Sequence, residues 1–171
     1  PVGFDPSPLV EGQGDCYTCF VTNQPITLEQ QYGLRQGDGY EVVTFADLGS
    51  AQYADVVFVD RTALAENRDR LVRFMRATMR GWDDYLADPH AAAALAVDKY
   101  GVDLGLEMAQ QTRQAELQVP LIESPSGLFA MDVAAMEGPM WQALASGGYE
   151  NLPAPASFVD LGVLAEARPP S

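Results

Sequence analysis

One short apolar run constrains the fold more than any other part of the sequence. Residues 54–60 read Ala-Asp-Val-Val-Phe-Val-Asp, which places four consecutive strand-forming side chains between two aspartates. Consecutive strand residues point to opposite faces, so this run predicts a strand that is buried on both faces, as in the sheet of an α/β protein.

The other strand signals precede this run, and most helical signals follow it. β-Branched and aromatic residues predict two more strands, at about residues 15–22 and 40–45. Capping residues and three-and-four spacing predict a short helix over 25–31 and longer helices over 67–86, 90–100, 106–118, 132–146 and 158–166. Three strands make a small sheet for so many helices. The layout therefore predicts that further strands come from an absent amino-terminal segment, and that the chain begins in mid-protein or after processing.

The charge of the chain argues against one class of partner. The formal net charge is −14, and a surface this acidic repels phosphate backbones. We therefore expect no nucleic-acid partner. The sequence also lacks the run of about 18 apolar residues that a membrane-spanning helix needs.

Two cysteines and one histidine are the residues most suited to metal or redox chemistry. Cys16 and Cys19 form a Cys-x-x-Cys pair, but a structural zinc site needs about four ligands and no second pair follows. A redox pair needs its first cysteine at a helix start, whereas the surrounding residues predict a strand. This favours two buried structural thiols, with a ligand-lining role and a redox or metal role as the alternatives. His90 is expected to be exposed at a helix start. We predict no cofactor and no metal.

Four segments, in this order, carry a resemblance to a known family. They are residues 15–25, 45–58, 66–94 and 117–124. The first ends in Val21-Thr22-Asn23-Gln24-Pro25, and the second begins with Phe45-Ala46-Asp47-Leu48-Gly49. Together they resemble the periplasmic substrate-binding proteins of ABC importers, in the thiamine-pyrimidine group that is close to the nitrate, sulfonate and taurine binders. The segments correspond to the carboxy-terminal half of such proteins.

The resemblance implies a fold, a function and a set of partners. The fold would be the two-lobed α/β fold of type II periplasmic binding proteins. Residues 1–52 would belong to the second lobe, and residues 53–171 would form the return crossover and the helices that pack on the first lobe. The protein would have no catalytic residues. It would capture a small molecule between the lobes, with a thiamine-precursor pyrimidine as the first expectation and riboflavin-like or sulfonate-like compounds next. Its partners would be the membrane subunits of the importer and the missing amino-terminal half, in a periplasmic or extracytoplasmic, membrane-anchored location.

Five residues are the candidates for contact with such a ligand: Asn23, Asp47, Tyr53, Tyr17 and Cys19. Asn23 lies where a predicted strand leaves the sheet, and a helix-capping role is the equal alternative. Asp47 and Tyr53 flank the segment that would re-enter the first lobe, and a turn-forming role for Asp47 is about as good. Tyr17 and Cys19 lie on the predicted first strand, where only one face can meet a ligand.

The long helix predicted over 67–86 carries two further features. Trp82 lies in its apolar stripe and is expected in the core. Five arginines, at positions 68, 70, 73, 76 and 80, spread around this helix and are expected to form a solvated face paired with Asp69, Glu66 and Asp83. Docking of these arginines against a transporter is an alternative with no other support in the sequence.

Two other functions compete with solute binding. The eukaryotic thiamine-pyrimidine synthase resembles this fold and carries a cysteine cluster, so an enzyme of that kind is the alternative. A one-lobed regulatory or scaffold module is the third, and it would require the chain to fold alone.

Overall fold

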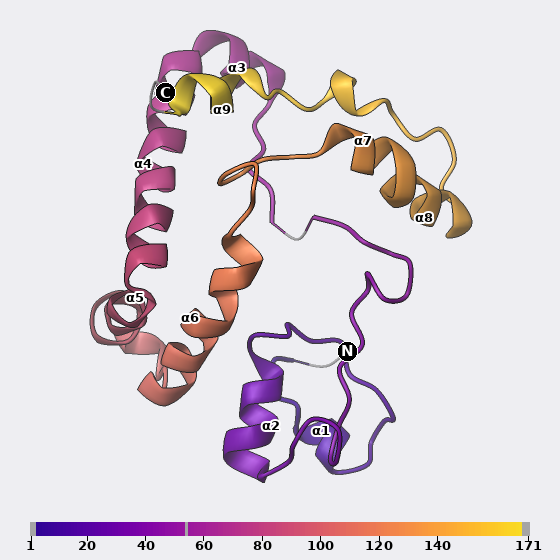
Figure 1. The fold of residues 1–171 in the computed structure, drawn as a ribbon, viewed down its shortest axis with the longest axis vertical. Helices are drawn as coiled ribbons and strands as arrows, with labels where there is room; N and C mark the ends of the chain where they lie inside the picture. Colours follow the sequence, from indigo (N-terminus) through magenta and orange to yellow (C-terminus); the bar gives the residue numbers. More distant parts are fainter. Residues whose placement is uncertain (1–2, 54, 169–171) are drawn as a thin grey trace. The chain divides into compact units, whose positions relative to one another are not determined.

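The computed structural model describes residues 3–53 and 55–168, and this part of the chain is helical or irregular. Figure 1 shows the α-helices, which are α1 (Ser7–Val10), α2 (Gln24–Tyr32), α3 (Arg61–Glu66), α4 (Arg68–Ala87), α5 (Pro89–Leu95), α6 (Met108–Ile122), α7 (Val133–Ala135), α8 (Trp141–Ser146) and α9 (Gly162–Ala167). Two π-helical turns continue α5 and α7, over Ala96–Tyr100 and Met136–Met140, and short 3-10 helices lie at Val102–Leu104 and Pro155–Ser157. Across the described ranges, no helix is both long and apolar enough to cross a membrane.

The chain divides into two units. The first comprises Pro1–Val42 and Asp83–Glu123, and the second comprises Val43–Trp82 and Ser124–Ser171. Helix α4 begins in the second unit and ends in the first. The two units are described separately below.

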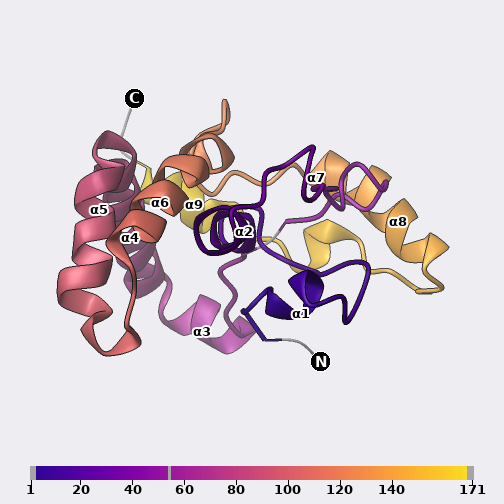
Figure 2. The same ribbon diagram turned by 90° about the horizontal axis from the view of Figure 1, so that it is seen from below.

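In the first unit, α6 is the central helix. Helix α5 packs along it, and α2 contacts it as well (Figure 2). The buried apolar residues of these helices are Ile26 and Leu28 of α2, Ala93 of α5 and Ala115 of α6. Pro25 fits the first turn of α2 because its fixed φ and missing N–H cost nothing there. Gly33 ends the helix in the left-handed conformation that favours glycine.

In the second unit, α9 packs on α4. Val72 and Met75 of α4 form a buried cluster with Ala167 of α9. Four partly buried apolar residues pack against this cluster: Met79, Phe129, Val163 and Leu164. Two arginines of α4 bind the α9 segment. Arg68 pairs with Asp160 and Glu166, and Arg76 donates to the backbone carbonyls of residues 166 and 167.

The structure contradicts the prediction of a two-lobed α/β fold. The described residues contain no strand ladder. They form one isolated β-bridge, between Gln36 and Tyr40. Residues 15–22 and 40–45 form loops and turns, and residues 55–60 are irregular. The apolar side chains of the last segment are exposed, and Phe58 is 87% exposed. The physical reason is that strand propensity acts only through pairing. No other described segment forms a ladder with these residues.

The helical predictions are largely confirmed. Helix α4 matches the predicted 67–86, and Asp88 and Asp132 cap α5 and α7 by accepting N–H bonds from Ala91 at 2.9 Å and Ala135 at 3.1 Å. Four details differ. The last helix, predicted over 158–166, is α9 and spans Gly162–Ala167. Pro120 lies in the last turn of α6, which continues to Ile122. Helix α3 was not predicted. Asp60 caps it, and Asn67, the predicted cap of α4, is the residue that ends α3.

Candidate ligand-binding site

The start of α2 gathers several polar side chains in the first unit. Thr22 and Gln24 are both buried. Gln24 satisfies both ends of its amide locally, because its Oε1 accepts the Phe20 N–H at 2.9 Å and its Nε2 donates to the Phe4 carbonyl at 3.3 Å. Gln24 therefore fixes the loop that leads into α2.

Asn23 points its side chain to another helix. It stands at the N-cap position of α2 but makes no capping bond with its side chain. Its Nδ2 instead donates to Oε1 of Gln114 in α6 at 2.9 Å. One turn further along both helices, Gln110 Nε2 donates to Thr27 Oγ1 at 3.3 Å. We call Asn23, Thr27, Gln110 and Gln114 the amide seam.

The amide seam offers both hydrogen-bond donors and hydrogen-bond acceptors. Its members are partly buried and uncharged, and three of the four carry an amide with both a donor and an acceptor. Ring nitrogens and exocyclic amino groups need that combination of donors and acceptors. The two bonds across the seam leave other donor and acceptor positions of these side chains unused by the described residues.

Cys19 and Tyr40 lie near each other beside α2. Burial raises the pKa of the half-buried Cys19 thiol. Tyr40 donates a hydrogen bond to Glu29 Oε1 of α2 at 2.9 Å. Burial, with a smaller contribution from Glu29 and from Cys19, raises the pKa of Tyr40 to about 12. Both groups are therefore protonated near neutral pH, which makes them hydrogen-bond donors and weak nucleophiles.

Tyr17 and Cys16 occupy the loop that was predicted to be a strand. The Tyr17 hydroxyl donates to the carbonyl oxygen of Gly3. Cys16 is exposed and Cys19 half-buried, and both are free thiols. The prediction of two buried structural thiols is therefore wrong for Cys16, because the strand that would have covered it does not form.

The other two predicted ligand residues belong to the second unit. Asp47 is exposed, and its Oδ2 accepts from the Thr44 hydroxyl at 2.6 Å and the Thr44 N–H at 3.0 Å. These bonds lower the pKa of Asp47 and give it the turn-forming role that was the alternative. The Tyr53 hydroxyl accepts the N–H of Asp132 at 2.6 Å and so supports the start of α7. The structure thus brings Tyr17, Cys19 and Asn23 into one unit and Asp47 and Tyr53 into the other.

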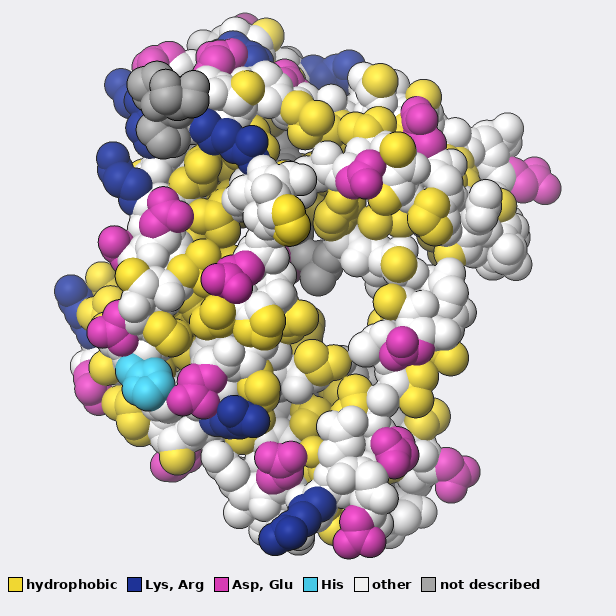
Figure 3. Space-filling view, in the orientation of Figure 1, with side chains coloured by type: hydrophobic (Ala, Val, Ile, Leu, Met, Phe, Trp, Pro, Cys, Tyr) yellow, Lys and Arg dark blue, Asp and Glu magenta, His cyan; other side chains and the backbone are white. Residues whose placement is uncertain are grey.

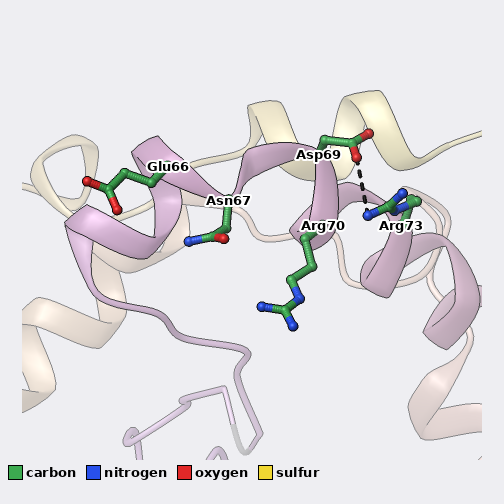
Figure 4. Close-up of a pocket in the computed structure, with 5 residues that line it drawn as sticks. All are labelled: Glu66, Asn67, Asp69, Arg70 and Arg73. Carbon is green, nitrogen blue, oxygen red and sulfur yellow. Dashed lines mark ion pairs between the residues drawn. The ribbon is translucent and has the colours of Figure 1, made fainter.

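A polar depression of about 330 Å³ lies at the junction of α3 and α4 in the second unit (Figure 4). Its lining residues are Glu66, Asn67, Asp69, Arg70 and Arg73. Asp69 and Arg73 form an exposed ion pair at 3.3 Å. The depression contains no aromatic or apolar side chain that would hold a ring.

The groups suited to metal binding are dispersed. Among residues 3–53 and 55–168, no three His, Cys, Asp or Glu side chains lie close enough to hold an ion. His90 is exposed, as predicted, and pairs with Glu116 of α6 at 3.0 Å. Glu116 also pairs with Arg113 at 3.3 Å, and these partners lower its pKa.

Thr27, Gln110 and Gln114 were not predicted as site residues. A signal for them exists in the spacing. Asn23 and Thr27 are four residues apart, and so are Gln110 and Gln114, so each pair lies on one helix face. Two matching polar pairs of this kind predict two helices that pair along a polar seam.

Comparison with known proteins supports the coarser part of the resemblance. The family model described as NMT1/THI5 like matches residues 1–92, more than half of the 171 residues. All five predicted ligand residues lie within the matched part. No curated protein and no solved structure gives a significant match. The thiamine-pyrimidine group and the assignment to a carboxy-terminal half stay predictions. From the extent of the match, the chain belongs to the NMT1/THI5-like family.

Proposed function

We propose that this chain is part of the solute-binding component of an ABC import system and binds a small nitrogen heterocycle, in the first instance a thiamine-precursor pyrimidine. The observation that carries the proposal is the amide seam in a chain of the NMT1/THI5-like family. In this function the protein acts outside the cytoplasmic membrane, and the membrane subunits of the importer receive the ligand.

The chemistry of the seam supports a pyrimidine as ligand. A pyrimidine ring offers nitrogen acceptors, and an amino substituent offers donors, which match the side-chain amides of Asn23 and Gln114. A neutral hydrogen bond contributes only about 0.5–1.5 kcal/mol net. Exchanging the Asn23–Gln114 bond for bonds to a ligand therefore costs the fold little.

The exposed apolar segment supports a partner polypeptide. Val56, Val57, Phe58 and Val59 are all at least 43% exposed, and their backbone amides and carbonyls form no hydrogen bond with the described residues. Unpaired apolar segments of this kind are association surfaces. We propose that the amino-terminal half of the same protein covers this segment.

A direct binding measurement tests the function. The full-length protein is titrated calorimetrically with the hydroxymethyl-pyrimidine precursor of thiamine, with riboflavin and with taurine. We expect saturable binding of the pyrimidine. We also expect Asn23→Ala to weaken it about two- to tenfold, since one neutral hydrogen bond is lost.

The matched control is Gln30→Ala, which removes an exposed amide from the same helix. It should leave the affinity unchanged. Absence of binding to all three compounds would contradict the proposal. If both substitutions weakened binding equally, the amide seam would not be the ligand-binding site.

The synthase-like enzyme remains the alternative, and the same preparation distinguishes it. Incubation of the protein–pyrimidine complex with iron(II) and oxygen should leave the bound molecule unchanged. Iron-dependent consumption of a bound substrate would replace the binding function with an enzymatic one.

A further inference from the structure

We infer that the outward face of α4 is a docking surface for an acidic segment of the importer's membrane subunits. The inference rests on the proposed function and adds to it the place where the partner binds. The face consists of Arg70, Arg73, Phe74, Ala77, Arg80 and Gly81, and we call it the arginine face. Its residues follow steps of three and four, so they share one side of the helix.

The arginine face carries positive charge in a negative protein. Five of the ten lysines and arginines in the chain lie within residues 68–80 of α4, and Asp69 is the one acidic residue there. In Figure 3, cationic side chains gather along the upper part of this helix. With a net charge of −14 for the whole chain, residues 68–80 are a local exception.

These arginines divide into two groups by what they contact. Arg68 and Arg76 hold the α9 segment, through Asp160, Glu166 and the backbone carbonyls of residues 166 and 167. The arginines of the face do not take part in that contact. Arg73 pairs with Asp69, and both side chains are more than two-thirds exposed. Arg70 and Arg80 form no ion pair with the residues that the structure describes. The first group therefore holds α9, whereas Arg70 and Arg80 of the second group have no ion pair among the described residues.

An aromatic residue lies among these arginines. Phe74 belongs to the apolar stripe that the sequence predicts for the core, yet it is 54% exposed. The buried side of α4 is formed by Val72 and Met75. A helix face that carries an exposed aromatic side chain and three arginines has the composition of protein–protein hot spots, which are enriched in aromatic residues and arginine.

Gly81 gives independent support. A glycine inside an exposed helix costs about 1 kcal/mol relative to alanine. A Cβ added to Gly81 would meet no atom within 4 Å, so packing within the described structure does not require the glycine. Together with Ala77 on the same face, it leaves room for the backbone of a partner to come close to the helix.

The chemistry of the face favours an acidic protein segment over an anionic membrane. The planar guanidinium matches carboxylates with two parallel hydrogen bonds. Arg68 of the same helix already holds the carboxylates of Asp160 and Glu166. A net charge of −14 also repels an anionic lipid surface.

The test compares two double variants of equal charge. Arg70→Glu with Arg80→Glu changes the arginine face, and Arg35→Glu with Lys99→Glu changes two exposed cations elsewhere. Each lowers the net charge by four. Binding of the full-length protein to the importer from its own host, in nanodiscs of neutral phosphatidylcholine, is measured by surface plasmon resonance. We expect the first variant to lose at least tenfold in affinity for the importer and the affinity of the second to change less than twofold. Phe74→Ala should weaken binding to the importer without changing the salt dependence of that binding.

Three results would overturn the inference: equal loss in both double variants, no loss in either, or binding of the wild type to phosphatidylglycerol vesicles but not to the importer. The same variants are titrated with the thiamine-precursor pyrimidine. If the wild type binds the pyrimidine and the arginine-face variant binds the importer normally, the docking surface is wrong and the proposed function stands. If the wild type binds no pyrimidine, the proposed function itself fails.

Discussion

Two helix contacts, one in each unit, differ in how their polar edges are built. In the second unit, α9 is held on α4 by charged bonds, which include Arg68 Nη2 to Glu166 at 2.7 Å and Arg68 Nη1 to Asp160 at 3.1 Å. In the first unit, the edge between α2 and α6 consists of the neutral pairs Asn23–Gln114 and Thr27–Gln110. Both contacts also bury apolar side chains.

This contrast indicates which contact suits a ligand. Arg68 holds two carboxylates at once and so fixes the position of the α9 segment, although water solvates the ions of such exposed pairs. A neutral amide can exchange one partner for another at small cost. The charged edge therefore fixes structure, and the neutral edge can admit a ligand. Three predictions, from the largest effect to the smallest, test whether the two contacts differ in this way.

The largest effect should come from the apolar cluster beneath the charged edge. Met75 is 7% exposed and contacts the α9 side of the cluster. Met75→Ala should cost about 2–5 kcal/mol of unfolding free energy, because it leaves a cavity in a packed site. Equilibrium urea unfolding followed by tryptophan fluorescence measures the loss.

Phe74→Ala is the control, since Phe74 is the neighbouring residue in the same helix and is 54% exposed. It should change the unfolding free energy by less than about 0.5 kcal/mol. A larger loss for Phe74 than for Met75 would mean that the buried side of α4 has been assigned wrongly.

The helices of this protein were predictable from its sequence, because their signals are local. Asp88 and Asp132 are side-chain caps that precede alanine- and valine-rich turns, and each forms the expected bond to the backbone three residues on. The absence of strands from the described part of the chain was not predictable in this way, because a strand forms only when its backbone pairs with a neighbouring strand. Residues 55–60 have strong strand propensity and no partner among the described residues.

The surroundings of the predicted ligand residues could be foreseen only where they are local. Asn23 was chosen because it lies at the end of a predicted strand; the strand does not form, and the structure places Asn23 at the N-cap position of α2. Its contact with Gln114 joins residues 91 positions apart, and single-chain periodicity gives no distance of that kind. Asp47 shows the opposite case, because its bonds to Thr44 are local and follow from turn chemistry.

Acid should separate the two contacts. Arg68 lowers the pKa of Asp160, and the N–H groups of Gly162 and Val163 lower it further. A lowered folded-state pKa means that the stabilisation is present above the ordinary aspartate pKa of about 3.9 and is lost as the pH falls through the folded-state value. Below about pH 4, we therefore expect α9 to exchange its amide hydrogens faster, relative to intrinsic rates, while α2 stays protected.

Arg68→Met is the matched variant, since it removes the charge and keeps much of the side-chain length. It should weaken the protection of α9 at neutral pH and reduce its acid dependence. Glu116 of α6 also titrates in acid, but its partners are His90 and Arg113, so it acts on α5 and on α6 itself. Equal acid-induced exchange in α2 and α9 would contradict the distinction between the two edges.

The smallest effect should appear in alkali, at α2. Burial and the bond to Glu29 raise the pKa of Tyr40 to about 12. A raised folded-state pKa means that the stabilisation is fully present below the ordinary tyrosine pKa of about 10 and is lost as the pH rises through about 12. Ultraviolet titration of the seven tyrosines should therefore show a late step. Tyr40→Phe should remove part of that step and cost less than about 1 kcal/mol at neutral pH, because only one exposed hydrogen bond is lost.

Tyr100→Phe is the control, because Tyr100 is 75% exposed and lies outside α2. Burial also raises the pKa of Tyr85, so some late ionisation should persist in Tyr40→Phe. The useful readout is thus amide exchange in α2. If this exchange rises with pH in the wild type but is flat in Tyr40→Phe, then Tyr40 and Glu29 supply the one strongly pH-dependent contact of α2. The amide seam would remain neutral across the whole range, as an edge that exchanges partners with a ligand requires.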